Sequence, residues 1–358
     1  MAAARHRIPA WSWAAPLVAP GLLLAPAAGW VLVPIGLALA ATVFAAVHHA
    51  EVVAHRLGEP YGTLVLALAV TVIEVALIVS LMLAPGADKP ELARDTVFAA
   101  VMIVGNGIVG LCLLAGGARH REQGYNLSGT ASLLAVLVAL TTLTLVLPAH
   151  TTSIAGPRYN SAQLVFVALV SLLLYGTFLF VQTIRHRDYF LPVEPLPEDV
   201  HADPPPAGIA WASFGLLLPC LVAVVLLAKA VSPAVQGAVA AAGAPLATVG
   251  VVIALLVLLP EGLAALNAAR QDRLQTALNL ALGSALCTIG LTIPAVAALC
   301  LELDLPLTLG LAAKEQVLLA LTIVLSVLTL ATTGRTTVLP GVVHLVVFAT
   351  FLFLTVVP

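Results

Sequence analysis

The chain has 358 residues, of which 61% are hydrophobic and only 9% carry a charge, and its mean hydropathy is +1.10. Because about a quarter of the residues in soluble proteins are charged, this composition excludes a soluble globular protein and indicates an integral membrane protein. The net charge of -2, with no basic cluster in the sequence, predicts no nucleic-acid partner.

Eleven apolar runs of about 20 residues follow one another along the chain. A helix of this length crosses the hydrocarbon core, and alternating barrel strands are absent, so the sequence predicts an all-α polytopic membrane protein with about 11 transmembrane helices. The first run follows Arg5 and Arg7 and ends in Ala25-Pro26-Ala27, so a cleaved signal peptide is its alternative. The predicted spans are Trp13–Ala28, Trp30–Val53, Tyr61–Leu83, Thr96–Leu114, Ala131–Leu147, Leu164–Ile184, Ile209–Ala230, Leu246–Ala268, Leu274–Leu299, Leu307–Thr332 and Val338–Val357.

The basic residues predict how these spans are oriented. Of the 15 Lys and Arg residues, ten fall on the side of the membrane that holds the N-terminus and five on the other side. Since cytoplasmic loops carry an excess of Lys and Arg, we expect the N-terminus to be cytoplasmic and, with eleven spans, the C-terminus to be outside.

A Pro-rich, acidic segment over residues 186–208 divides the chain. We interpret it as an extended cytoplasmic linker, with an acidic cation-sensing loop as the alternative. The predicted organisation is an N-terminal segment and first helix (1–28), a five-helix repeat (29–185), the linker, and a second five-helix repeat (209–358). Because a tandem unit with an odd number of spans inserts in opposite orientations, the two repeats should be inverted.

Each repeat carries one acidic residue in its second span. These residues are Glu74 and Glu261, and each is the single charged residue of a long apolar run. An ionisable residue at mid-membrane is costly, which points to a functional site. In an inverted repeat the two second spans cross near mid-membrane, so Glu74 and Glu261 could together bind a metal cation through oxygen ligands. Protons compete with a cation for such buried carboxylates, and alternating access would then give obligatory exchange.

Polar residues near the two glutamates are candidate supporting ligands. Pairs of glycine and a polar residue recur in the third span of each repeat, as Gly105-Asn106 and Gly283-Ser284. Thr71 shares a helix face with Glu74, while Thr288 and Thr292 continue the face of Ser284. Helix packing is the alternative role for these hydroxyls. Pro260 and Gly262 flank Glu261 and would expose backbone carbonyls to a cation.

A second polar group occurs at the cytoplasmic end of the second predicted span. It consists of His48, His49, Glu51 and His55. His48, Glu51 and His55 share one helix face and could relay protons, bind a metal or give a cation access to the site. The alternative is an interfacial polar belt in which Glu51 pairs with Arg56.

Several segments together resemble a known family. They are Ala69-Val-Thr-Val-Ile-Glu-Val-Ala-Leu-Ile, Met102-Ile-Val-Gly-Asn-Gly, Pro260-Glu-Gly-Leu-Ala-Ala-Leu and Asn279-Leu-Ala-Leu-Gly-Ser-Ala-Leu-Cys-Thr-Ile-Gly. They resemble the bacterial ChaA-type calcium/proton and sodium/proton antiporters of the cation/calcium exchanger superfamily. The resemblance implies one N-terminal helix, two inverted five-helix repeats, and two glutamates that bind cation and proton in turn. It also implies a bacterial inner-membrane location.

The sequence departs from the superfamily pattern at the residues before each glutamate. The pattern has Gly-Asn there, whereas this chain has Val70-Thr71 and Val257-Leu258. An amide ligand is thus missing from both glutamate helices, which leaves selectivity between Ca²⁺ and Na⁺ or K⁺ open.

Our first functional hypothesis is a secondary antiporter that exports Ca²⁺ in exchange for H⁺, with Na⁺ left open as a further substrate. A monovalent Na⁺/H⁺ or K⁺/H⁺ antiporter is the alternative. An intramembrane metalloenzyme built around His49 is remote, since the chain offers His-His-Ala-Glu in place of a His-Glu-x-x-His motif. A passive channel would differ from an antiporter in lacking proton-dependent flux. We therefore predict no enzyme activity and no cofactor beyond the transported cation and H⁺. The expected partners are inorganic cations, protons and the lipid bilayer, with a homo-oligomer left open.

Overall fold

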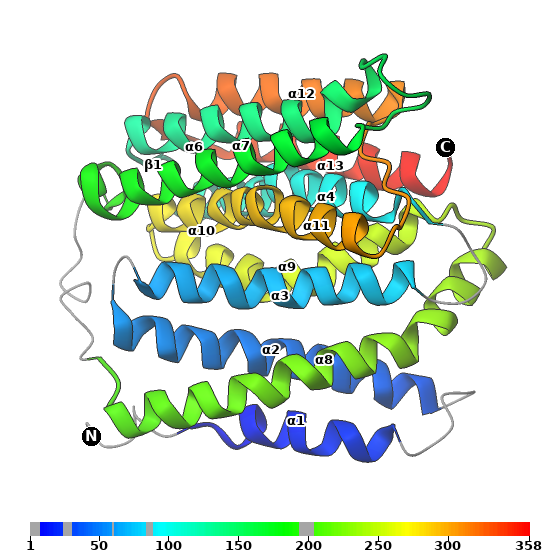
Figure 1. Ribbon diagram of the computed structural model, residues 1–358. Coiled ribbons are helices and arrows are strands. Elements are labelled where there is room, and N and C mark those ends of the chain that lie inside the picture. The colour runs from blue at the N-terminus through cyan, green and yellow to red at the C-terminus, as the bar shows by residue number, and fades with distance from the viewer. Residues whose placement is uncertain (1–7, 24–30, 59–60, 84–88, 193–203) are drawn as a thin grey trace. The chain divides into compact units, whose positions relative to one another are not determined.

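The computed structural model describes residues 8–23, 31–58, 61–83, 89–192 and 204–358 (Figure 1). In these ranges it is almost entirely helical, and ten helical stretches are long and apolar enough to cross a membrane. Five of them precede the predicted linker and five follow it, which confirms the predicted five-plus-five arrangement. The stretches are Leu32–Leu57, Tyr61–Met82, Leu92–His120, Leu127–Ala149, Ser161–Arg185, Ala207–Ala241, Ala247–Arg270, Leu274–Glu302, Ala313–Leu330 and Val338–Val356.

The helices group into two compact units that do not coincide with the two halves of the sequence. The first unit contains α1 (Ala10–Leu22), α2 (Leu32–Leu57), α3 (Tyr61–Met82) and α8 (Ala207–Ala241). Within it the long helix α8 packs along α2 and also contacts α1 and α3. Gly62 lets α3 approach α2 closely, because a Cβ at this position would collide with the backbone carbonyl of Ala54.

The second unit contains the remaining elements. In chain order they are α4 (Leu92–Met102), η3 (Ile103–Ile108), α5 (Val109–His120), β1 (Gln123–Gly124), α6 (Leu127–Thr141), η4 (Thr142–Val146), η5 (Leu147–Ala149), α7 (Ser161–Phe180), η6 (Val181–Arg185), η7 (Arg187–Phe190), α9 (Ala247–Arg270), α10 (Leu274–Cys287), η9 (Thr288–Thr292), α11 (Ile293–Glu302), α12 (Ala313–Leu330), β2 (Arg335–Thr336) and α13 (Val338–Val356). The short strands β1 and β2 pair in antiparallel fashion, with Gln123 opposite Thr336.

Helix α9 is central to the packing of the second unit. It contacts α4, α5, α10 and η3, while α13 packs on α5 and η3. Helix α6 contacts α10 and α12, and α7 contacts α11. Glycines allow the closest approaches: a Cβ at Gly250 would lie 2.9 Å from the backbone of Asp95 and Thr96, and a Cβ at Gly341 would lie 2.5 Å from the backbone nitrogen of Leu114. Close backbone contact of this kind is how helices associate in a bilayer.

Several predicted span boundaries differ from the structure. Helix α1 ends at Leu22, and residues 24–28 of the predicted first span lie outside the described residues. Helix α8 continues to Ala241, well past the predicted end at Ala230, and contains both Pro219 and Pro233. Helix α12 begins only at Ala313, although the apolar run starts at Leu307.

The stretch before α12 shows why hydropathy placed that boundary wrongly. Leu309 and Leu311 are as buried as helix core residues, but this segment is extended. The Gly310 amide donates to the Pro157 carbonyl at 3.0 Å, and the Leu311 amide donates to the Leu145 carbonyl at 2.8 Å. Buried apolar backbone is tolerated outside a helix where the protein itself satisfies its hydrogen bonds. The predicted domains 1–28, 29–185, 186–208 and 209–358 divide the chain by its expected sequence repeat. The two compact units divide it by contacts between helices, so they do not test these boundaries, which stay a prediction.

Candidate functional site

Glu74 lies on α3 in the first compact unit and is only 2% exposed. Glu74 is the single charged residue of this helix, which packs against α2 and α8. Thr71, one turn before Glu74, is also buried, and its hydroxyl donates to the Ala67 carbonyl at 2.8 Å. Because the hydroxyl proton is used within the helix, Thr71 can offer only an oxygen lone pair to another partner, which is what a cation requires.

Glu261 lies on α9 in the second compact unit and is partly buried. It follows Pro260, which α9 contains without a break. A proline inside a helix removes one backbone hydrogen bond and leaves a carbonyl without its helical donor. Gly262 then allows α9 to approach η3 closely, since a Cβ at this position would lie 3.1 Å from Cδ1 of Ile108.

The third spans of the two halves share an irregularity that the sequence did not reveal. Each is interrupted near its middle by a π-helical turn, η3 over Ile103–Ile108 in the first half and η9 over Thr288–Thr292 in the second. Such turns widen the helix, leave backbone groups with altered partners, and occur frequently at functional sites. Asn106 lies within η3 and Thr288 begins η9, so two predicted supporting ligands lie on these turns.

Ser284 and Thr288 occupy successive turns of α10 and η9. Ser284 is partly buried and Thr288 is 1% exposed. The Thr288 backbone amide lies at the junction and donates to the carbonyls of Ala285 and Ser284. Within the described part of the chain, the Thr288 hydroxyl has no hydrogen-bond partner. A buried hydroxyl of this kind is available to a ligand.

Asn106 is fully buried and is already hydrogen bonded on both sides of its amide. Its nitrogen donates to the Thr322 hydroxyl on α12 at 2.8 Å, and its oxygen lies 3.1 Å from Nδ1 of His344 on α13. Sequence analysis missed both partners. His344 could have been found, since it is the one ionisable residue of the apolar span Val338–Val356, and such residues mark functional positions.

The histidine cluster near the end of α2 is partly engaged in packing. Nε2 of His49 lies 3.1 Å from the Ser12 carbonyl, and the His48 ring lies against Trp11 with centroids 5.3 Å apart. Both histidines thus contact α1, whereas Glu51 and His55 are exposed. Among the residues that the structure describes, no three His, Cys, Asp or Glu side chains are grouped so as to hold a metal ion. A proton relay or cation access route through this cluster stays a prediction.

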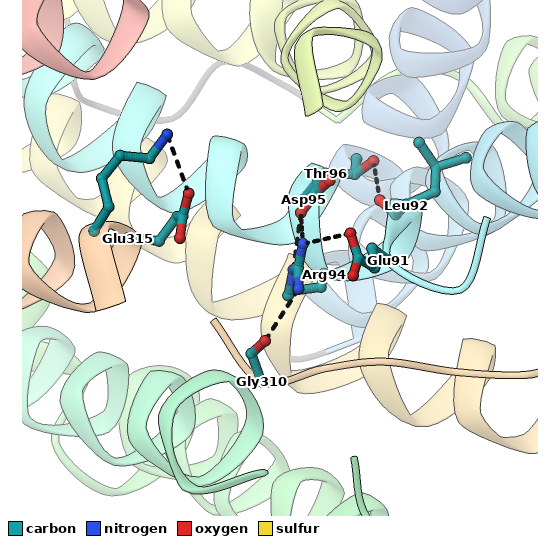
Figure 2. A network of polar contacts seen from close by, with 8 residues as sticks. Glu91, Leu92, Arg94, Asp95, Thr96, Gly310 and Glu315 are labelled. Atoms are coloured by element: carbon teal, nitrogen blue, oxygen red, sulfur yellow. Dashed lines mark hydrogen bonds and ion pairs between the residues drawn. The ribbon is translucent and has the colours of Figure 1, made fainter. Parts of the chain in front are cut away.

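A network of charged residues lies at the N-terminal ends of α4 and α12 (Figure 2). The Arg94 guanidinium pairs with Asp95 at 2.8 Å and Glu91 at 3.1 Å, and it donates to the Gly310 carbonyl at 3.1 Å. Lys314 pairs with Glu315 at 3.5 Å. Asp95, Lys314 and Glu315 line a cavity of about 150 Å³ whose other walls are largely apolar. These carboxylates already have cationic partners, so the network stabilises the ends of the helices.

The structure therefore describes two separate halves of the predicted ion site. Glu74 and Thr71 belong to the first compact unit, and Glu261, Asn106, Ser284 and Thr288 belong to the second. Within the second unit, η3 contacts both α9 and α10, which brings the helices of Glu261, Asn106 and Ser284 together. Convergence of Glu74 and Glu261 on one cation stays a prediction.

Comparison with known proteins identifies the family. The chain matches the model of the sodium/calcium exchanger protein family over residues 27–184 and 212–357. It is 49% identical to y4hA of Sinorhizobium fredii (strain NBRC 101917 / NGR234), covering 98% of this chain and 97% of that protein. It is also 38% identical to the sodium-potassium/proton antiporter ChaA of Escherichia coli (strain K12), covering 86% of this chain and 84% of that protein.

A solved structure agrees at the level of the fold. The Ca²⁺/H⁺ antiporter YfkE aligns with a TM-score of 0.73 and covers 97% of this chain and 99% of that one, at 16% sequence identity. The family match and the relative ChaA confirm the predicted resemblance to cation exchangers and the prediction that the chain is a transporter and no enzyme. The chain belongs to the sodium/calcium exchanger protein family and is a multi-pass membrane antiporter of cations.

Proposed function

We propose that this protein exports Ca²⁺ from the cytoplasm in exchange for protons, with Glu74 and Glu261 as the groups that bind cation and proton in turn. The observation that carries the proposal is the burial of Glu74, which is 2% exposed and is the single charged residue of its transmembrane helix. A charge in such a place is costly unless a cation or a proton neutralises it. The carboxylate is therefore suited to being occupied by one or the other at each stage of a cycle.

The chemistry of the neighbouring groups supports a cation with oxygen ligands. Thr71 offers a hydroxyl oxygen one turn from Glu74, and the buried Thr288 hydroxyl lies on the first residue of the π-helical turn η9. Pro260 frees a backbone carbonyl on the helix of Glu261. Carboxylate, hydroxyl and carbonyl oxygens are the ligands that Ca²⁺ takes in proteins.

Proton coupling follows from competition at the same oxygens. A carboxylate that holds a cation cannot hold a proton, so binding of one releases the other. If the site faces one side of the membrane at a time, a cation leaves only when protons take its place. The inward proton gradient of a cell would then drive cation export.

A monovalent substrate is the second candidate. The relative ChaA, at 38% identity, is by its name a sodium-potassium/proton antiporter. The glutamate helices carry Val70-Thr71 and Val257-Leu258, so no amide oxygen is available from these positions. A site with fewer ligands suits a monovalent ion better, because Ca²⁺ takes six to eight oxygens.

We also infer that the protein resides in a bacterial inner membrane with a cytoplasmic N-terminus and an external C-terminus. Ten of the 15 Lys and Arg residues support this orientation. Labelling of single cysteines at positions 121 and 154 with a membrane-impermeant maleimide in intact cells tests it. Position 154 should react and position 121 should not; the reverse pattern would contradict the orientation.

The substrate is tested by proton flux in proteoliposomes that contain a pH-sensitive dye. Ca²⁺, Na⁺ and K⁺ are added separately at equal ionic strength, with liposomes lacking protein as the control. We expect Ca²⁺ to drive proton movement, with little response to the monovalent ions. A response to Na⁺ or K⁺ alone would replace Ca²⁺ by the second candidate, and no response to any cation would contradict proton-coupled exchange.

A further inference from the structure

His344 is a fully buried histidine in the middle of a transmembrane helix, and the proposed ion site does not use it. It lies on α13, and its side chain is 0% exposed. Both ring nitrogens have partners on other elements of the second unit. Nδ1 lies 3.1 Å from Oδ1 of Asn106 on η3, and Nε2 lies 2.9 Å from the Thr329 hydroxyl on α12. A buried polar chain of this kind fixes the groups that it joins.

The direction of the hydrogen bonds can be worked out from Thr322. Its hydroxyl donates to the Leu318 carbonyl at 2.8 Å, with the sulfur of Met102 as a second acceptor at 3.4 Å. The Thr322 oxygen accepts from the Asn106 amide nitrogen, 2.8 Å away. This fixes the amide, with its oxygen toward His344. The Nδ1 atom of His344 must therefore carry a hydrogen, which it directs at the Asn106 oxygen on η3; the backbone of Gly105, also on η3, is a further hydrogen-bond partner of the ring.

The other ring nitrogen of His344, Nε2, contacts the Thr329 hydroxyl. The Thr329 hydroxyl lies between Nε2 of His344 and the Leu325 carbonyl, which is 2.7 Å away. The hydroxyl can donate to either one, so this contact is satisfied whether or not Nε2 carries a hydrogen. The bond from Nδ1 to Asn106 is present in both cases. Of the two contacts, only the one to Asn106 reaches a predicted ion-site residue.

Tight packing connects this chain to the helix of Glu261. A Cβ at Gly110 would lie 3.1 Å from Cβ of His344, and a Cβ at Gly107 would lie 3.2 Å from the Phe348 ring, so α13 rests directly on η3 and α5. On its other side η3 contacts α9, where Ile108 faces Gly262 next to Glu261. The π-helical turn therefore lies between His344 and the helix that carries one of the two carboxylates.

We propose that His344 is a positioning residue for cation exchange: its Nδ1–H holds the amide of Asn106, and through it η3, in the arrangement that the ion site on α9 and α10 requires. The proposal rests on the proposed function, because it assigns His344 a role in that same site. It predicts that the Nδ1 donor matters and that the charge state of the ring does not, since Nδ1 is protonated in both forms.

Two substitutions separate the two ring nitrogens. In His344→Asn the side-chain amide nitrogen replaces Nδ1 and can still donate to Asn106, whereas in His344→Gln the amide reaches toward the position of Nε2 and Thr329. The measurement is the initial rate of cation-driven proton flux against cation concentration, at several pH values. His150→Asn is the matched control, since His150 is exposed in the turn directly after η5.

We expect His344→Gln to raise the apparent KM for the cation on the order of tenfold, the size of effect that loss of one buried hydrogen bond produces. His344→Asn should stay within about twofold of the wild type, with an unchanged pH profile. Wild-type behaviour of His344→Gln would overturn the proposal. So would equal loss in both variants, or a pH profile that flattens in both, because the ring would then act as a proton carrier.

A double-mutant cycle tests the same contact independently of the comparison between the two His344 variants. Asn106→Ala removes this contact together with the one to Thr322, so it should raise the apparent KM at least as much as His344→Gln does, and the double variant should be no worse than Asn106→Ala alone. Additive losses would overturn the proposal. Failure of the proposed function is distinct: it would show as wild-type protein without any cation-driven flux, whereas failure of this inference requires an active wild type.

Discussion

Gly262 lies directly against Ile108, and a Cβ at position 262 would come within 3.1 Å of the Ile108 side chain. This contact joins the residue after Glu261 to the π-helical turn that holds Asn106. Replacing Gly262 by Val should overpack the contact, at a cost of about 1–3 kcal/mol, and lower the rate of exchange. The measurement is the initial proton flux at saturating cation.

A second substitution at the contact between Gly262 and Ile108 is the control for this prediction. Because the crowding is with the far end of the Ile108 side chain, adding Ile108→Ala to Gly262→Val should restore much of the lost rate. If the double variant is no faster than Gly262→Val alone, the contact between α9 and η3 is not what limits exchange.

The packing of α13 on α5 predicts a strong effect on stability. A Cβ at Gly341 would meet the Leu114 backbone nitrogen at 2.5 Å, and backbone cannot move aside as a side chain can. Gly341→Ala should lower the thermal unfolding temperature in detergent by several degrees. Gly176→Ala on α7 is the control, since a Cβ there meets nothing within 4 Å and should leave stability unchanged or slightly higher. Equal unfolding temperatures for the two variants would contradict the described packing.

The ion pairs of Arg94 predict a second effect on stability. The side chains of Arg94 and Asp95 are only 12% and 14% exposed, so removing one partner leaves the other charge largely buried. Arg94→Ala should destabilise the protein by about 3–5 kcal/mol. Adding Asp95→Asn removes the orphaned charge and should recover part of the loss, which thermal unfolding would measure. A wild-type unfolding temperature for Arg94→Ala would mean that the network of Figure 2 contributes little.

Tyr159 gives a pH-dependent prediction outside the membrane spans. Its hydroxyl donates to the Leu143 carbonyl at 2.7 Å, and burial raises the pKa of Tyr159 to about 12. The unfolded pKa is about 10, so the stabilisation is fully present below pH 10 and is lost as the pH rises through 12. Tyr159→Phe should cost about 1 kcal/mol at neutral pH, and the gap to the wild type should narrow between pH 10 and pH 12. A gap of constant size over that range would show that Tyr159 does not titrate in this way.

Hydropathy predicted the spans because each is a long apolar run, and it placed Glu74 and Glu261 in the second span of each half. It could not find the π-helical turns η3 and η9, since these differ from α-helix in hydrogen-bond register and not in composition. It also extended the run at Leu307 into a helix, because a buried extended segment is equally apolar. These errors concern backbone geometry.

The partners of Asn106 could not be predicted for another reason. Thr322 and His344 lie 216 and 238 residues further along the chain, and no local pattern links them to Gly105-Asn106. Likewise His48 and His49 read as one polar cluster, and only the fold shows both of them in contact with α1. Contacts between helices that are distant in the sequence determine which polar residues are hydrogen bonded or packed against another helix.

The central claim, that two buried carboxylates exchange a cation for protons, is tested most directly by cation-driven proton flux in proteoliposomes with Glu74→Gln and Glu261→Gln. Glutamine keeps the size of the side chain and removes its charge and its titration. Glu302→Gln, at the exposed end of α11, is the matched control. Both glutamate variants should be expressed and folded yet lose exchange, while Glu302→Gln keeps it; near-normal flux in either glutamate variant would contradict the two-carboxylate site.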